Sequence, residues 1–234
     1  MVFGGSGVIG GAIAKAFGQK GWMVGIHYHQ HQAAAVEIGA TVKNAGGKSH
    51  LYQADVTNPS QVRNVLQDFV RSHGSLHVLV WAVGAGSSLL LIKTSPEDWT
   101  QTLRTNLTGA YHVLHAIAPI FARQKDGSVI LVGSLSGEQG LAGQAAYAAS
   151  KAGLVGLMQT AAQEWGSFNI RVNVIFPGWH LSPLSKSGLP LAMEHHTHTL
   201  HRTPSLTYVA TSVYHLAVSP DTSGQVWNLD SRIW

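Results

Sequence analysis

Short apolar runs with strand character alternate with longer helical patterns along almost the whole chain. This alternation predicts a parallel sheet, because two parallel strands need a long crossover connection, which is usually a helix. The segment Leu-His-Val-Leu-Val at 76–80 is almost entirely apolar, as is typical of strands covered by helices on both faces. We therefore expect an α/β fold, namely a single doubly wound Rossmann domain over residues 1–234 with a mostly parallel seven-stranded sheet.

The same pattern places the individual elements. The expected strands are 2–3, 22–28, 49–54, 76–83, 128–133, 170–176 and 225–229. Helical patterns occupy 8–19, 32–45, 60–72, 96–123, 147–165 and 205–216. Ligands of such sheets bind in the crevice beyond the carboxyl ends of the strands, so the residues that directly follow each strand are the candidate functional residues.

Composition excludes several classes of protein. The chain has no cysteine, which removes disulfides, thiolate metal sites and a cysteine nucleophile, and which fits a cytoplasmic location. The 15 Lys and Arg against 11 Asp and Glu give a net charge of +4, but the basic residues are scattered, so no nucleic-acid partner is expected. No stretch approaches the ~18 uninterrupted apolar residues of a membrane span, so no membrane partner is expected either.

A glycine-rich turn follows the first expected strand directly. It reads Gly-Gly-Ser-Gly-Val-Ile-Gly at 4–10 and opens an apolar helix. Glycines permit a tight turn and a close backbone approach, so the N–H groups at the helix N-terminus can meet a pyrophosphate. This pattern predicts a dinucleotide cofactor, with contacts from Gly4, Ser6, Gly7, Ile9 and Gly10.

The end of the second expected strand bears on which dinucleotide binds. It reads His27-Tyr28-His29-Gln30, with no Asp or Glu to accept hydrogen bonds from the ribose hydroxyls. An acid there would repel a 2′-phosphate, whereas Tyr28 and His29 offer donors. We therefore expect NADP(H) as the cofactor, with NAD(H) as the alternative.

Tyr147 and Lys151 are four residues apart and hence lie on one face of a helix. A nearby ammonium favours a phenolate, so we expect Lys151 to lower the pKa of Tyr147 from about 10 towards neutrality. Such a phenol can give a proton to a carbonyl or accept one from an alcohol. Ser134 lies at the end of the fifth strand, where it can hydrogen-bond the same substrate oxygen.

These residues carry a family resemblance that covers almost the whole chain. Gly-Ser-Leu-Ser-Gly at 133–137 and Gly-Gln-Ala-Ala-Tyr-Ala-Ala-Ser-Lys-Ala-Gly at 143–153 resemble the active-site block of the short-chain dehydrogenase/reductase family. Within that family the block is most similar to that of 3-oxoacyl-[acyl-carrier-protein] reductases. Asp55-Val56, Asn-Leu-Thr-Gly at 106–109, Arg-Val-Asn at 171–173 and Pro177-Gly178 match further family motifs in the same order.

The resemblance implies a role for each matching residue. Tyr147 would protonate the carbonyl oxygen of the substrate, Ser134 would polarise it, and Lys151 would hold the ribose hydroxyls of the cofactor. Asn106 would position a water that relays protons towards Lys151. Further cofactor contacts are implied for Asp55 and Val56 beside the adenine and for Gly84, Pro177, Gly178 and Ser182 near the nicotinamide.

The function implied is NADPH-dependent reduction of a small-molecule or acyl-carrier-bound carbonyl, with a place in fatty acid synthesis. A pteridine or other small-carbonyl reductase is the alternative within the family. A catalytically silent dinucleotide-binding or scaffold protein is the alternative outside it. The features that favour the silent protein are the very short first strand, Val8 in place of a glycine, and Trp81, which we expect to enlarge a position near the cofactor.

Two further expectations concern the surroundings of the site. Residues of about 185–203 show no strong strand pattern and are expected to form a solvated substrate lid containing His195, His196, His198 and His201. No metal site is expected there, because the segment lacks clear acidic partners. The resemblance also implies a homodimer or homotetramer that pairs through the helices at 96–123 and 147–165.

Overall fold

The computed structural model describes residues 1–182 and 198–232, and within them the chain forms one α/β domain. Its strands are β1 (Val2–Phe3), β2 (Met23–Tyr28), β3 (Lys48–Gln53), β4 (Val78–Trp81), β5 (Gly127–Val132), β6 (Ile170–Phe176) and β7 (Val226–Asn228). They form a seven-stranded sheet in the order β3-β2-β1-β4-β5-β6-β7. Every neighbouring pair is parallel, so the predicted doubly wound fold is confirmed and the sheet is parallel throughout.

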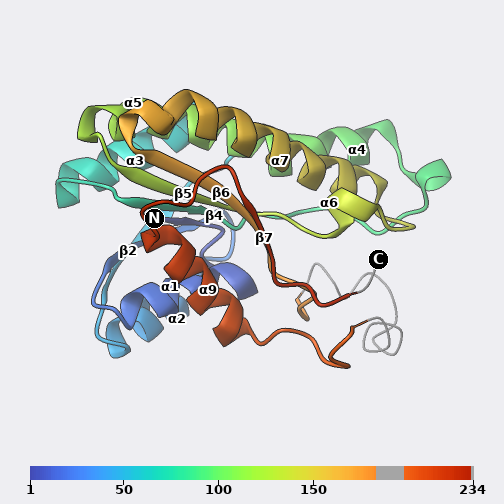
Figure 1. The fold of residues 1–234 in the computed structure, drawn as a ribbon, viewed down its shortest axis with the longest axis horizontal. Helices are drawn as coiled ribbons and strands as arrows, with labels where there is room; N and C mark the ends of the chain where they lie inside the picture. The colour runs from blue at the N-terminus through green and yellow to red at the C-terminus, as the bar shows by residue number, and fades with distance from the viewer. Residues whose placement is uncertain (183–197, 233–234) are drawn as a thin grey trace.

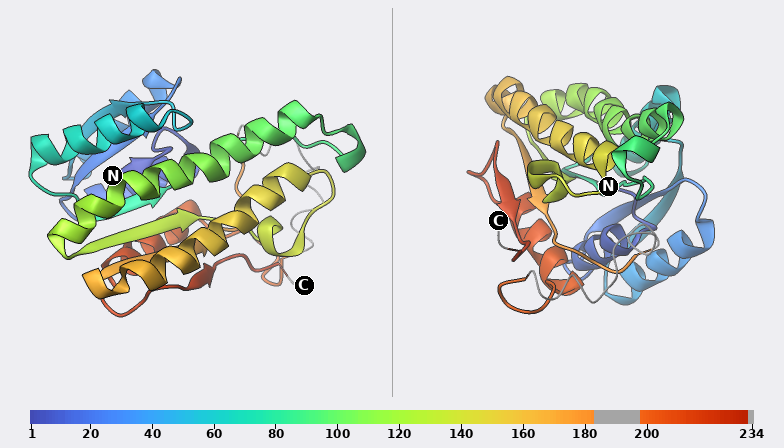
Figure 2. Two further views of the ribbon diagram at one scale, coloured as in Figure 1. Left: turned by 90° about the horizontal axis from the view of Figure 1, so that it is seen from above. Right: turned by 90° about the vertical axis from the view of Figure 1, so that its right-hand side faces the viewer.

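Helices cover both faces of the sheet (Figure 1). One face carries α1 (Val8–Gly18), α2 (Gln32–Asn44) and α9 (Leu206–Val218). The other carries α3 (Pro59–His73), α4 (Pro96–Leu103), α5 (Gly109–Gln124), the short α6 (Ser136–Gln139) and α7 (Ala145–Trp165). Seen from above in Figure 2, the two longest of these helices, α5 and α7, run side by side across the sheet. None of the helices within the described ranges has the length and apolar character needed to cross a membrane.

Capping residues explain where two of the helices begin. Asn58 precedes α3, and its side chain accepts hydrogen bonds from the backbone N–H groups of Ser60 and Gln61 at 3.0 and 3.2 Å. Ser95 precedes α4 in the same way and accepts from the N–H of Asp98 at 3.0 Å. In both helices a proline follows the cap, at a position whose N–H would have no helical partner.

The long helix expected at 96–123 is interrupted. A π-helical turn, η2 (Arg104–Thr108), separates α4 from α5. Asn106 lies at its centre, and its buried side chain forms hydrogen bonds with the backbone of Ala85 in the loop after β4. Such π-bulges are frequently found at functional sites. The expectation of one continuous helix is therefore wrong at this point, because a tertiary contact overrides the helical pattern.

Trp81 lies in the core and does not enlarge a position near the cofactor. Successive side chains of a strand point to opposite faces, and Trp81 shares the face of Leu79, which packs under α3, α5 and α7. Its indole is fully buried against Gly109 of α5, where a Cβ would lie only 3.0 Å from Cη2 of the ring. The absence of a side chain at Gly109 thus makes room for the Trp81 ring. Trp81 therefore no longer favours a catalytically silent protein.

We expect Gly109→Ala to lower the free energy of unfolding by about 1–3 kcal/mol, because the new methyl group overpacks the core against Trp81 and Val56. Urea unfolding measures the effect. The double variant with Trp81→Phe supplies the control, since the smaller ring leaves room for the methyl. If the two substitutions destabilised the protein additively, the packing argument would be wrong.

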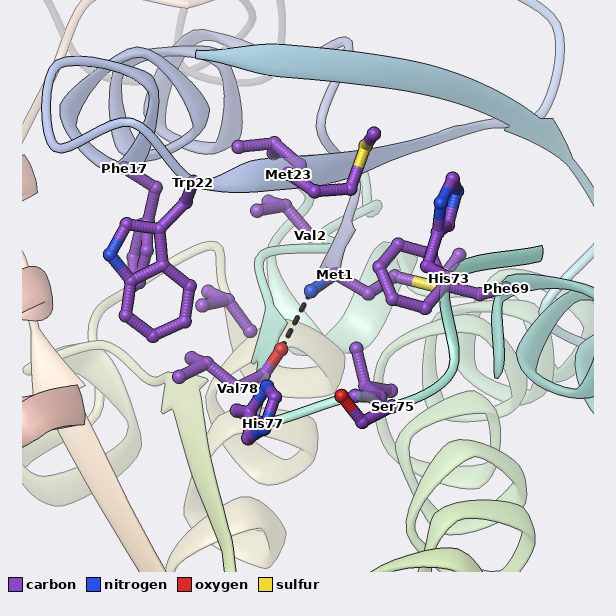
Figure 3. Close-up of a pocket in the computed structure, with 13 residues that line it drawn as sticks. Met1, Val2, Phe17, Trp22, Met23, Phe69, His73, Ser75, His77 and Val78 are labelled. Carbon is purple, nitrogen blue, oxygen red and sulfur yellow. Dashed lines mark hydrogen bonds between the residues drawn. The ribbon is translucent and has the colours of Figure 1, made fainter. Parts of the chain in front are cut away.

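β1 is as short as the sequence predicts, and a cavity of about 170 Å³ lies beyond its amino end, between the starts of β2 and β4 (Figure 3). The amino group of Met1 donates a hydrogen bond to the Val78 carbonyl at 2.6 Å there. The cavity is lined by residues at the starts of β1, β2 and β4 and by Phe17, Phe69 and His73 of α1 and α3. It therefore lies on the opposite edge of the sheet from the carboxyl ends. It is therefore separate from the candidate active site described next.

Candidate active site

Three predicted catalytic side chains come together at the carboxyl edge of the sheet. Ser134 follows the end of β5, while Tyr147 and Lys151 come from the first two turns of α7. The Ser134 side chain lies near the Tyr147 phenol and acts to lower its pKa. The Lys151 ammonium lies 5.6 Å from the centre of the Tyr147 ring, as the i, i+4 spacing predicts. A hydroxyl, a phenol and an ammonium therefore share one small site.

Lys151 is buried, and backbone carbonyls hold its ammonium. Nζ donates to the Val132 carbonyl at 2.8 Å and to the Val83 carbonyl at 3.4 Å. An ammonium has three donors, so one more is available for a ligand hydroxyl. Burial lowers the pKa of Lys151 to about 8, because the charged form loses its hydration.

The expected lowering of the Tyr147 pKa by Lys151 is not what this arrangement produces. Burial raises the pKa of Tyr147 above its ordinary value, because the phenolate would lose its hydration. The Ser134 side chain and the positive charge of Arg232 act to lower that pKa without outweighing burial. Tyr147 is therefore a neutral phenol at neutral pH, which is the form that a proton donor requires.

Arg232 is the residue near this site that the sequence reasoning missed. Its guanidinium lies against the buried carboxylate of Asp230, with Nε 2.9 and 3.0 Å from the two carboxylate oxygens. Asp230 lies next to the loop that follows β6. A Cβ built on Gly178 of that loop would be 3.7 Å from the Asp230 Cα. None of the motifs named above includes Asp230, Ser231 or Arg232, so the sequence gives no signal for this contact.

Replacing Arg232 by glutamine removes a positive charge that favours the Tyr147 phenolate. We expect the pKa of Tyr147 to rise further, so alcohol oxidation, which needs the phenolate, shifts to higher pH. The measurement is the pH profile of kcat/KM for oxidation. Arg232→Lys keeps the charge and should retain the wild-type profile. An unchanged or more acidic profile in Arg232→Gln would contradict this role.

Asn106 links the loop after β4 to α7. Its Oδ1 accepts from the Ala85 N–H and its Nδ2 donates to the Ala85 carbonyl, both at 2.8 Å. Nδ2 also donates to Oγ of Ser150 at 3.0 Å, and that hydroxyl donates to the Tyr147 carbonyl at 2.7 Å. The side chain is thus occupied in holding the loop, and its role in a water relay stays a prediction.

The glycine turn has the shape of a pyrophosphate site. Gly4 has φ +74° and approaches β4 so closely that a Cβ would lie 2.7 Å from the Ala82 carbonyl oxygen. A Cβ on Gly10 would lie 2.2 Å from the Gly4 carbonyl oxygen, so α1 packs directly on the turn. No described side chain caps α1, whose N-cap is Gly7, and its first N–H groups are therefore available to an anion. Ser6 and Ile9 flank the Gly7-Val8 pair and are only partly buried.

The ends of β2 and β3 form the adenine side of the predicted cofactor site. Tyr28 is 7% exposed and belongs to the core, whereas His29 is exposed. Asp55 accepts a hydrogen bond from the Thr57 N–H at 2.8 Å. Burial acts to raise the pKa of Asp55, but the hydrogen bonds from Thr57 and the charge of His29 outweigh it and hold the pKa below its ordinary value. Val56 is buried beside it, and His112 Nδ1 donates to its carbonyl at 3.0 Å.

The remaining predicted residues lie in the loops after β4 and β6. Gly84 precedes the Ala85 peptide held by Asn106, and Pro177, Gly178 and Ser182 follow β6. Of the predicted lid, His195 and His196 lie outside the described residues. His198 is not solvated as expected, because it is 1% exposed and its Nδ1 is hydrogen-bonded to the Ser231 hydroxyl at 2.9 Å. His201 is exposed, and no cluster of potential metal ligands occurs among the residues the structure describes.

The fold and the site define the class of doubly wound dinucleotide-dependent oxidoreductases. Residues 1–189 match the family model described as short chain dehydrogenase. The chain therefore belongs to the short-chain dehydrogenase/reductase family, as its sequence motifs predict, and is an oxidoreductase of that family.

Individual relatives agree with this assignment. The 3-oxoacyl-[acyl-carrier-protein] reductase of Homo sapiens is 33% identical over 234 residues, which cover 99% of this chain and 96% of the human protein. The reductase of the same name from Staphylococcus epidermidis is 33% identical over 187 residues, covering 80% of this chain and 77% of that protein. Among solved structures, NAD+-bound xylitol dehydrogenase is similar with a TM-score of 0.92 and 25% identity, covering 98% of this chain and 96% of its own.

Proposed function

We propose that the protein is an NADPH-dependent reductase that converts a 3-oxoacyl thioester, carried on an acyl carrier, to the 3-hydroxyacyl thioester. The observation that carries the proposal is the meeting of Ser134, Tyr147 and Lys151 at the carboxyl edge of a sheet whose glycine turn suits a pyrophosphate. The human and staphylococcal relatives support this choice of substrate.

The chemistry follows from the protonation states of the site. When bound, the dihydronicotinamide supplies a hydride to the carbonyl carbon. The Ser134 hydroxyl donates a hydrogen bond to the carbonyl oxygen, and Tyr147 gives that oxygen its phenolic proton. The Lys151 ammonium stabilises the phenolate left on Tyr147 and offers its remaining N–H to the ribose hydroxyls. Carbonyl, hydride and proton together give the alcohol.

The NADPH preference is part of the proposal and rests on His29. This side chain is exposed at the end of β2, and the strand end His27-Tyr28-His29-Gln30 contains no acid of its own to bind ribose hydroxyls or to repel a 2′-phosphate. Because Tyr28 is buried in the core, we assign the phosphate contact to His29 alone.

We expect His29→Asp to raise the Kd for NADPH at least about tenfold and to leave NADH binding equal or tighter. A carboxylate at this position repels the 2′-phosphate and accepts hydrogen bonds from free ribose hydroxyls. Fluorescence titration of both cofactors measures the change. His31→Asp introduces the same charge at an exposed position two residues further on and should alter neither Kd by more than about twofold. Equal effects of the two substitutions would argue against the role of His29.

The experiment that tests the function follows NADPH absorbance with an acetoacetyl thioester, a dihydropteridine or no added substrate, alongside NADPH and NADH titrations. Rapid oxidation of NADPH with the thioester supports the proposal. Preference for the dihydropteridine would favour the pteridine reductase alternative. Binding of NADPH without turnover on any carbonyl would indicate a silent module.

We also propose a homo-oligomer that pairs through the exposed faces of α4, α5 and α7, which are the helices that the sequence predicts to pair. These faces present Trp99 and Tyr111, which are 38% and 49% exposed although large aromatic side chains are usually covered. Sedimentation velocity tests this arrangement, and a monomer at micromolar concentration would contradict it. A cytoplasmic location and a place in fatty acid synthesis remain predictions from the sequence.

A further inference from the structure

His27, the penultimate residue of β2, lies between two parts of the proposed cofactor site. It is 2% exposed, and its ring lies against Phe3 with 4.7 Å between the ring centres. Nδ1 accepts a hydrogen bond from the backbone N–H of Gly4 at 3.2 Å. Nε2 lies 3.0 Å from the carbonyl oxygen of Ala54. Both ring nitrogens are therefore bound to the backbone of neighbouring strands or the turns that follow them.

These two partners fix the protonation state of the ring. The Gly4 N–H can only donate, so Nδ1 carries no proton, and the Ala54 carbonyl can only accept, so Nε2 carries one. A protonated ring would place a second N–H against the N–H of Gly4. Burial also favours the neutral ring, because it lowers the pKa of His27 to about 4. His27 is a neutral Nε2–H tautomer throughout the physiological range.

The two backbone groups belong to separate binding segments. Gly4 begins the glycine turn on which α1 packs, and its φ of +74° is a conformation that glycine adopts readily and other residues rarely do. Ala54 directly precedes Asp55 and Val56 on the adenine side, and its N–H donates to the Tyr28 carbonyl at 3.1 Å. One imidazole therefore connects the pyrophosphate turn, β2 and the adenine side.

We propose that His27 is a positioning residue that holds the glycine turn and the Asp55–Val56 segment at the separation a dinucleotide requires. This inference rests on the proposed function, since it assumes that the nucleotide binds at these segments. His27 comes from β2, whereas Ser134 lies in the loop after β5 and Tyr147 comes from α7. It should therefore govern cofactor affinity and leave proton transfer to the substrate largely unchanged.

The test compares His27→Phe, His27→Asn and His50→Phe. Phenylalanine keeps a ring against Phe3 but loses both hydrogen bonds, asparagine keeps an acceptor and a donor, and His50 is an exposed histidine on β3. We expect His27→Phe to raise the Kd for NADPH about tenfold or more, with kcat at saturating NADPH within about twofold of wild type. His27→Asn should recover part of the affinity, and His50→Phe should bind like wild type.

A second readout does not depend on the variants being folded. Nitrogen NMR of wild-type protein labelled at histidine should show a neutral Nε2–H ring at position 27 at pH 6. A protonated ring, or the Nδ1–H tautomer, would overturn the inference. Unchanged NADPH affinity in His27→Phe, or a loss of kcat without a change in Kd, would overturn it as well. If wild-type protein binds neither NADPH nor NADH, the proposed function itself fails, whereas wild-type binding with an unaffected variant rejects His27 alone.

Discussion

Tyr147→Phe is expected to lower kcat for carbonyl reduction by about 10²–10⁴-fold, with the Kd for NADPH within about twofold of wild type. The substitution removes only the hydroxyl that donates the proton, and the ring stays in place on α7, 5.6 Å from the Lys151 ammonium. Because burial keeps the pKa of Tyr147 high, the wild-type residue carries its proton at neutral pH. The loss should therefore be the same at pH 6 and pH 8.

Initial rates at saturating NADPH measure the effect, and a fluorescence titration shows whether the cofactor still binds. Tyr208→Phe is the matched control, because it removes a phenolic hydroxyl from an exposed position on α9. It should retain wild-type turnover. Near-normal reduction by Tyr147→Phe would reject Tyr147 as the proton donor.

Gly10→Ala should weaken NADPH binding by at least about 100-fold and lower the free energy of unfolding by about 1–3 kcal/mol. The new Cβ would lie 2.2 Å from the Gly4 carbonyl oxygen, and this neighbour is backbone of the turn itself. Relief of the clash must push α1 and the turn apart. The N–H groups that would meet the pyrophosphate then lose their arrangement.

Gly11→Ala supplies a matched control in the same helical turn. A Cβ there meets mainly the tip of the Ile38 side chain, at 2.6 Å, and a flexible side chain can move aside. Alanine also favours a helix over glycine. We expect cofactor affinity within about threefold of wild type for Gly11→Ala. Equal losses in both variants would contradict the close packing of α1 on the turn as the cause.

The sequence predicts those parts of the fold that depend on local signals. The helices expected at 60–72 and 96–123 begin within one residue of the observed starts at Pro59 and Pro96, where Asn58 and Ser95 form caps. The apolar runs also predict the buried strands of a parallel sheet. Tyr147 and Lys151 are brought together by helical spacing, which is again a local property.

Features that depend on distant contacts could not be predicted. The π-turn at Asn106 forms because its amide binds the Ala85 backbone 21 residues away. The expectation that Trp81 enlarges a position near the cofactor failed because nothing local shows that Gly109 makes room for its ring. Arg232 affects Tyr147 only because β7 ends next to the turn after β6. The pKa of Tyr147 is raised and not lowered because the side chain is buried, and the spacing of Tyr147 and Lys151 does not reveal that burial.

Transfer of deuterium from NADPH tests the central claim most directly. Wild-type protein is incubated with an acetoacetyl thioester and NADPH that carries deuterium at C4 of the dihydronicotinamide, on each face in turn. We predict that the 3-hydroxy product gains one deuterium at the former carbonyl carbon from one of the two labelled cofactors, and that Tyr147→Phe forms almost no labelled product. NADPH that binds but yields no labelled alcohol from any carbonyl substrate would contradict the account.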